Sequence, residues 1–300
     1  MIKIAWKANY ILDLPVNHPF PMEKYELLPV QLKRQGIASE EDFFTPSALC
    51  EEDILLTHSA EYWHKLKNLL LSSKEEKKTG FPQSEAMVER EVDICGATLS
   101  LAEHALVNGC GFNIAGGTHH AFSDHGEGYC LLNDNAVAAN VLLKRKQVKK
   151  VLIVDLDVHQ GNGTAEIFSG NKNVFTFSMH GERNYPSQKM NSDLDIPLKC
   201  GAGDAEYLPL LKEHLDRIIN TEKPDIIFYQ AGVDVLEGDR FGRLALSING
   251  CMERDLTVFS KCHSLSIPLV VTMGGGYSRK ISTIIDAHTN TFRIGYDLFK

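Results

Sequence analysis

The segment 151–163 constrains the fold of this 300-residue chain more than any other stretch. It begins with the apolar, β-branched run Val-Leu-Ile-Val, which predicts a buried strand, and it then turns abruptly to Asp155, Asp157 and His159. Because side chains alternate across a strand, we expect these three to share one face while the residues between them enter the core. Buried carboxylates need charge compensation, and mixed Asp and His ligation suits zinc.

Further short apolar runs predict a parallel sheet. Together with the first run they give five expected strands: 112–115, 151–154, 174–177, 226–229 and 269–273. Helical periodicity separates them, with Ser84 and Asp204 as expected helix caps and the charged stretch 72–80 as an expected loop. Strands alternating with helices predict an α/β fold, an open parallel β-sheet flanked by helices on both faces, in a single domain over residues 1–300.

Each expected strand is followed by polar residues of a kind that carries chemistry. These are His119 and His120, the Asp155 group, His180, Asp234, and the Gly274-Gly-Gly-Tyr277 loop. Ligands bind outside the carboxyl ends of strands in open α/β sheets, so five segments deliver candidate groups to one edge.

Those groups predict a hydrolytic site. Asp157, His159 and Asp234 can supply three metal ligands and leave positions open for water and a carbonyl. One of the adjacent histidines can act as general base, and Tyr277 can donate to a developing oxyanion. The set predicts metal-assisted amide hydrolysis.

Composition narrows the setting. A formal net charge of −8 argues against sequence-independent nucleic-acid binding and suits a cationic substrate better. Seven cysteines without Cys-x-x-Cys spacing favour reduced thiols. We see neither a signal-peptide apolar block nor a run of membrane-spanning length, so we expect a cytoplasmic protein with no membrane insertion.

The ordered motifs resemble those of the zinc-dependent histone deacetylases, within the arginase–deacetylase three-layer fold. The matching elements are Gly116-Gly-Thr-His119-His120, Gly128-Tyr129-Cys130-Leu-Leu-Asn133-Asp134, the Asp155–Gly163 segment, Asp234 and Gly274-Gly-Gly-Tyr277. They cover the chain from about Phe20 onward. The segments 18–25 and 236–242 look closest to the class IV branch and its bacterial relatives.

The resemblance implies a role for each matching residue. Asp157, His159 and Asp234 would hold one zinc ion, His120 would be the general base, and His119 its electrostatic partner. Asp155 would orient His119. Asn162 would orient His120 where many relatives have aspartate, so a lower basicity of His120 is implied. Tyr277 matches the oxyanion tyrosine.

The resemblance also implies a tunnel for an acyl-lysine side chain of a protein or peptide. Its expected walls are Gly128, Tyr129, Cys130, Tyr185 and Phe241. Thr118 stands where a tryptophan often precedes the histidine pair, which leaves the preferred acyl length open.

A monovalent cation, usually potassium, is implied beside the zinc strand. Its expected ligands come from Asp155, Asp157, His159, Ser178 and Met179. A second such site would lie near Phe168, Asn171 and Val174.

Three alternatives stay open from sequence. The substrate could be a small amide such as an acetylated polyamine, although we see in this compact chain no insertion of the kind that narrows the entrance in those enzymes. The fold could serve as a non-catalytic binding module, which the complete set of site residues disfavours. A two-manganese ureohydrolase is disfavoured because the full second set of aspartates is missing. Oligomeric state and physiological substrate are not indicated.

Overall fold

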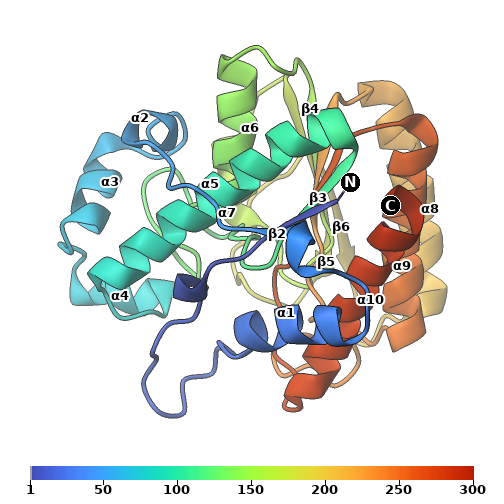
Figure 1. Cartoon of the computed structure of the whole chain (residues 1–300), viewed down its shortest axis with the longest axis horizontal. Coiled ribbons are helices and arrows are strands. Elements are labelled where there is room, and N and C mark those ends of the chain that lie inside the picture. Colours follow the sequence, from blue (N-terminus) through green and yellow to red (C-terminus); the bar gives the residue numbers. More distant parts are fainter. Residues whose placement is uncertain (1) are drawn as a thin grey trace.

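The computed structural model describes residues 2–300, which form one eight-stranded sheet with helices packed on both faces (Figure 1). Its strand pairs are all parallel, in the order β2-β1-β3-β8-β7-β4-β5-β6. This confirms the predicted α/β architecture. The strands are β1 (Lys3–Ala5), β2 (Phe43–Phe44), β3 (Cys110–Asn113), β4 (Val151–Asp155), β5 (Val174–Gly181), β6 (Leu194–Leu198), β7 (Ile226–Gln230) and β8 (Leu269–Thr272).

The five strands expected from apolar runs are all present, and three others are not predicted by the sequence. β1 and β2 are only three and two residues long, too short to show a period. β6 lies at the sheet edge, is mostly half-buried and contains Pro197, which removes a backbone donor. Edge strands of this kind give little hydrophobic signal, whereas every residue of the central strands β4 and β7 is buried.

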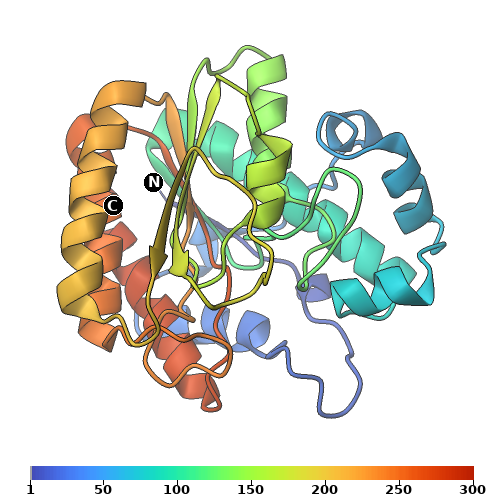
Figure 2. The ribbon, with the colours of Figure 1, turned by 180° about the vertical axis from the view of Figure 1, so that it is seen from behind.

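The helices form two layers around the sheet. α5 (Glu85–Asn108), α6 (Asp134–Lys144) and α7 (Asn162–Ile167) pack together on one side. α8 (Asp204–Glu222), α9 (Ile248–Leu265) and α10 (Ile281–Phe299) pack on the other, joined by α1 (Lys24–Arg34), as both views show (Figures 1 and 2). The short helices α2 (Glu51–Ile54), α3 (Ala60–Lys67) and α4 (Ser73–Thr79) lie to one side of the sheet, by α5 (Figure 1).

The stretch 72–80, expected to be a charged loop, is instead the helix α4. Ser72 and Glu75 form a reciprocal capping box, with the Ser72 N–H donating to the Glu75 carboxylate at 2.7 Å. Gly80 ends the helix in a left-handed conformation with φ of 82°. Both are ordinary helix-boundary signals, which the run of charges obscures.

Of the two expected caps, one is confirmed and one is wrong. The Ser84 side chain accepts a hydrogen bond from the Met87 N–H and caps α5. Asp204 is the first residue of α8, which Gly203 caps, and its carboxylate accepts from the backbone N–H and hydroxyl of Ser247, the cap of α9. Asp204 therefore ties the starts of two helices together.

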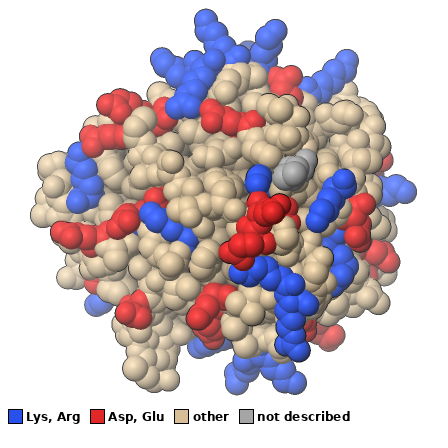
Figure 3. Space-filling view, in the orientation of Figure 1, with Lys and Arg blue, Asp and Glu red and all other residues tan. Residues whose placement is uncertain are grey.

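Within residues 2–300, no helix is long and apolar enough to cross a membrane. On the face drawn in Figure 3, acidic and basic side chains are interspersed without a large patch of one sign. The parallel strands present their carboxyl ends to one edge of the sheet, and the loops at that edge carry the candidate site.

Candidate active site

The loop that carries His119 and His120 leaves β3 and is anchored by a buried carboxylate. Asp134, the first residue of α6, accepts hydrogen bonds from the N–H groups of Gly117 and Thr118 at 3.0 and 2.9 Å, and from the Thr118 hydroxyl. A side chain thus satisfies backbone donors that a buried loop would otherwise leave unpaired. The anchor fixes the position of the histidine pair.

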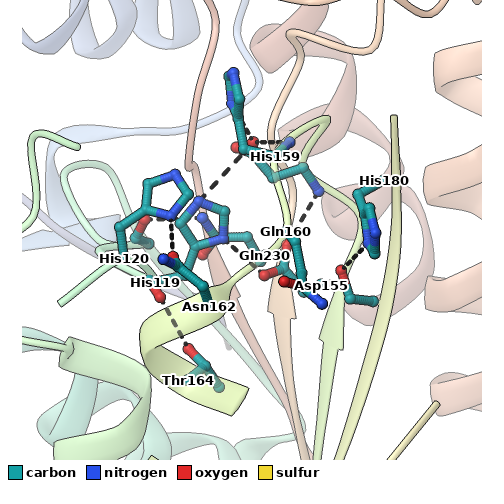
Figure 4. A network of polar contacts seen from close by, with 12 residues as sticks. His119, His120, Asp155, His159, Gln160, Asn162, Thr164, His180 and Gln230 are labelled. Atoms are coloured by element: carbon teal, nitrogen blue, oxygen red, sulfur yellow. Dashed lines mark hydrogen bonds and ion pairs between the residues drawn. The ribbon is translucent and has the colours of Figure 1, made fainter. Parts of the chain in front are cut away.

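The two histidines have different partners. His119 Nδ1 lies 2.7 Å from the Asp155 carboxylate, and His120 Nδ1 lies 2.6 Å from the Asn162 amide oxygen. Figure 4 shows both rings beside the strand end that carries Asp155, with Asn162 reaching them from α7. The structure brings together these four residues, which the sequence predicts to act together.

Their surroundings separate the two imidazoles electrostatically. Burial opposes a charge on His119, but the neighbouring carboxylates Asp155 and Asp157 outweigh it and raise its pKa. Burial, together with the charges of His119 and His159, holds the pKa of His120 well below its ordinary value. Near neutral pH, His120 is therefore the ring that is free to accept a proton.

Asp157, His159 and Asp234 converge in a buried cluster. One ligand atom from each lies within 4.8 Å of the others. β4 ends at Asp155, so the expected strand alternation does not reach Asp157 and His159, which stand in bends beyond it. The carboxylates are held by backbone donors instead: the Gly275 N–H donates to Asp157 at 2.8 Å, and the Val158 N–H to Asp234 at 2.9 Å.

This cluster fits a divalent cation. His159 Nδ1 lies 3.0 Å from an Asp157 oxygen and 3.1 Å from Asp234 Oδ2, so one ring N–H stands between two buried carboxylates. Asp234 Oδ2 is buried and receives no hydrogen bond from the described residues. Burial and the charge of Asp157 raise the pKa of Asp234 to about 7. A metal between the three groups would remove this conflict and leave coordination positions open.

Tyr277 follows the glycine loop after β8 and faces the cluster. Its N–H donates to the Asp239 carboxylate at 2.7 Å, and its ring centroid lies 6.2 Å from that of His159. Burial and the nearby carboxylates Asp234 and Asp157 raise its pKa well above the ordinary value, so the hydroxyl stays a donor. A Cβ at Gly275 would meet Asp234 Oδ2 at 2.0 Å, so a larger residue there would displace this carboxylate from the cluster.

A cavity of about 350 Å³ leads to this cluster. His120, His159 and Tyr277 line it, together with four of the five residues predicted as tunnel walls: Gly128, Tyr129, Tyr185 and Phe241. The rings of Tyr185 and His120 meet edge to face at 4.9 Å. Cys130 lies instead in a smaller pocket of about 30 Å³ that is also lined by His119 and Asp157, and burial raises the pKa of its thiol.

The expected potassium ligands lie beside β4 but are not tested by the structure. Ser178 pairs in register with Asp155, and both Ser178 and Met179 are buried. The Ser178 hydroxyl lies 2.9 Å from His180 Nδ1, and Figure 4 shows His180 on the far side of Asp155 from the histidine pair. The Asn171 N–H donates to the Phe168 carbonyl, and the N–H of Val174, the first residue of β5, donates to the Asn171 carbonyl. Both cation sites stay predictions.

Sequence reasoning misses two charged residues at the site. Glu127, directly before Gly128, accepts a hydrogen bond from the Asn162 amide at 2.5 Å. Lys24 is buried, and its ammonium donates to the Gly274 carbonyl at 3.0 Å and lies 5.8 Å from the Tyr277 ring centroid. Both stand within or beside the quoted motifs, but nothing in the sequence indicates what they contact.

Comparisons with known proteins agree with this geometry. A family model described as "Histone deacetylase domain" matches residues 18–292. The chain is 39% identical to an uncharacterized protein of Picosynechococcus, over 99% of both chains, and 29% identical to Histone deacetylase 2 of Arabidopsis thaliana, over 98% of this chain and 79% of that protein. The crystal structure of the HDA15 HD domain shares the fold, with a TM-score of 0.84 at 23% identity over 99% of this chain and 88% of that one.

Proposed function

This chain belongs to the histone deacetylase family, and on that premise we propose that it is a zinc-dependent deacylase of Nε-acyl-lysine in proteins or peptides. The observation that carries the proposal is the buried Asp157, His159 and Asp234 cluster at the base of a cavity with aromatic walls. Its aromatic walls suit the apolar methylene chain of a lysine.

The proposed hydrolysis assigns one task to each residue of this chain. Zinc held by the cluster would polarise the acyl carbonyl and lower the pKa of a water molecule. His120 is neutral, with its hydrogen on Nδ1 facing the Asn162 oxygen. Its Nε2 accepts the proton of the attacking water and then passes it to the departing lysine amine. The Tyr277 hydroxyl donates a hydrogen bond to the oxyanion. His119, held in place by Asp155, contributes positive charge.

Finer features of the proposal rest on the resemblance. A potassium ion beside β4 would be held by Asp155, Ser178 and Met179. The segments 18–25 and 236–242 support a placement near class IV within the family. We propose a cytoplasmic site of action, because the cysteines are free and follow no disulfide pattern.

One experiment separates the proposal from its alternatives. Purified protein loaded with one equivalent of zinc is assayed on a single lysine peptide carrying acetyl or longer acyl groups, with an acetylated polyamine alongside. Turnover of the peptides supports the proposal and reports the preferred acyl length. Preference for the polyamine moves the substrate to small amines, and zinc binding without any turnover supports a binding module.

A further inference from the structure

The open end of the cavity is basic, although the chain as a whole is acidic. The charged residues that line the cavity are Lys77, Lys78, Arg183 and Arg243, all exposed to solvent. Within residues 2–300, no Asp or Glu side chain lines it. The chain has a net charge of −8, with 39 acidic and 31 basic residues. A lining with four cations and, among the described residues, no carboxylate therefore runs against the overall composition.

Two of these four cations have a carboxylate partner and two have none in the described part of the chain. Lys78 forms an ion pair with Glu127 at 2.7 Å, and Arg183 lies 3.5 Å from the exposed Glu182. Lys77 and Arg243 have no carboxylate partner within residues 2–300. We call Lys77, Arg183 and Arg243 the basic mouth. Arg240 lies beside it, 5.3 Å from the centroid of the Phe241 ring.

We propose that the basic mouth selects acyl-lysine substrates that carry a carboxylate close to the acylated lysine. This inference rests on the proposed function and reverses the expectation, drawn from net charge, of a cationic substrate. Like charges at the mouth repel polyamines and lysine-rich peptides, whereas an acidic neighbour is attracted at the point of entry. The carboxylate can belong to a flanking Asp or Glu or to the end of the acyl chain.

The test compares matched peptides around one acetyl-lysine, with two Asp, two Asn or two Lys as flanking residues. A succinyl-lysine peptide with Asn flanks serves as a further arm. The Asp-flanked peptide is expected to have the lowest KM, rising about two- to fivefold when Arg243→Gln or Lys77→Gln removes one charge. Preference for the succinyl peptide instead assigns the carboxylate to the acyl chain.

Controls separate failure of this inference from failure of the proposed function. Lys74→Gln changes an exposed charge on the same helix as Lys77, outside the cavity, and leaves the KM values unchanged. Turnover of all peptides with equal KM, or the lowest KM for Lys flanks, overturns the basic mouth while the deacylase stands. No turnover of any peptide overturns the proposed function itself.

A second, independent observation concerns the charge behind the general base. Asn162 takes a position where an aspartate would give His120 a negative partner, but its amide also donates to Glu127 Oε1 at 2.5 Å. Glu127 is 6% exposed and touches Lys78 and the Tyr185 hydroxyl as well. Burial opposes its ionisation, but hydrogen bonds from His125, Lys78, Asn162 and Tyr185 prevail and lower its pKa.

We infer that Glu127 is a positioning residue that supplies, through the Asn162 amide, the negative charge that Asn162 itself lacks. The Asn162 oxygen accepts from His120 while its NH₂ group donates to the carboxylate. This fixes the amide orientation and polarises it toward the imidazole. The chain of contacts His120, Asn162 and Glu127 thus replaces a direct His–Asp pair.

A double-variant cycle tests this role. Glu127→Gln keeps the shape but loses the charge, and it is expected to lower kcat about tenfold or more with KM unchanged. Asn162→Asp alone places two carboxylates together and also lowers kcat. Combined with Glu127→Gln, the same Asn162→Asp change restores kcat, because the charge now contacts His120 directly and the introduced amide side chain can donate to it.

The decisive readout is that Asn162→Asp lowers kcat in the wild-type protein but raises it in the Glu127→Gln variant. If Glu127 were merely structural, the two losses in kcat would add. Additive or worse losses in the double variant, or wild-type kcat in Glu127→Gln with a normal zinc content, overturn the inference.

Discussion

The imidazole rings of His119 and His120 lie 4.1 Å apart between centroids, yet His119 Nδ1 faces a carboxylate and His120 Nδ1 an amide. Adjacent residues on one loop thereby acquire opposite pKa shifts, and only His120 is neutral by virtue of its surroundings. This difference supports the proposed division of proton transfer and charge stabilisation between the two neighbours.

Replacing His120, the proposed general base, should remove most of the rate. His120→Ala is expected to lower kcat by about 10²–10⁴ while zinc content and thermal unfolding stay close to wild type. The matched control is His263→Ala, an exposed histidine near the end of α9. A normal rate in His120→Ala, with the loss appearing in His119→Ala instead, would exchange the two assigned roles.

The Tyr277 hydroxyl should act in the transition state and not in folding. Tyr277→Phe is expected to lower kcat by about 10²–10³ at equal zinc loading, because the proposed oxyanion donor is the Tyr277 O–H. Steady-state kinetics with a parallel zinc determination checks this. Unchanged turnover would show that another group stabilises the oxyanion.

Metal binding should stabilise the fold through the buried cluster. Adding zinc to chelator-stripped protein is expected to raise the melting temperature, because the ion binds only the folded cluster and relieves two adjacent buried carboxylates. Asp234→Ala removes one ligand and should abolish most of the shift. If calorimetry finds the same shift in this variant, the ion binds elsewhere.

Gly163 should be essential for the position of the histidine loop. A Cβ at this residue of α7 would meet the Ala121 carbonyl oxygen at 2.2 Å and the His120 carbonyl carbon at 2.7 Å, both backbone atoms. Gly163→Ala must displace the loop and is expected to lower kcat about 10²-fold. Gly203→Ala, where the nearest atom to the added Cβ would be the Ala245 carbonyl oxygen at 3.1 Å, is the control and should retain activity.

His58 should make stability fall in mild acid. Its Nδ1–H donates to the Phe122 carbonyl and its Nε2 accepts from the Asn133 N–H, so the buried ring is held neutral. Burial lowers its pKa from 6.5 to about 4. The unfolded chain binds the extra proton first, so stability is complete above pH 6.5 and declines between pH 6.5 and 4, by about 3 kcal/mol in all.

Denaturant unfolding at several pH values tests this slope. His58→Gln, which does not titrate, should be less stable at neutral pH but show a flatter decline below about pH 6.5. An identical slope in both proteins would assign the acid sensitivity to other groups.

Sequence alone predicts the central strands β4, β7 and β8 well, because they are nearly continuous apolar runs, as burial on both faces requires. It also predicts which groups meet at one edge of the sheet, because parallel strands all present their carboxyl ends to the same edge. It does not predict the helix α4, although the capping box there is local, because a charge run such as the one at Lys77 and Lys78 is also typical of a solvated loop.

Contacts that join distant segments are beyond the sequence. Glu127 meets Asn162 across 35 positions, and Lys24 meets Gly274 across 250, and no periodicity links either pair. The basic mouth likewise draws Lys77, Arg183 and Arg243 from three loops or helix ends, so net charge favours the opposite expectation about the substrate.

Zinc-dependent deacylation by the Asp157, His159 and Asp234 cluster is tested most directly by titrating stripped protein with zinc while following hydrolysis of an acetyl-lysine peptide. Turnover is expected to rise linearly and to reach its plateau at one zinc per chain, whereas His159→Ala should reach no such plateau. Stoichiometric zinc binding at this cluster without hydrolysis of any acyl-lysine peptide would contradict it.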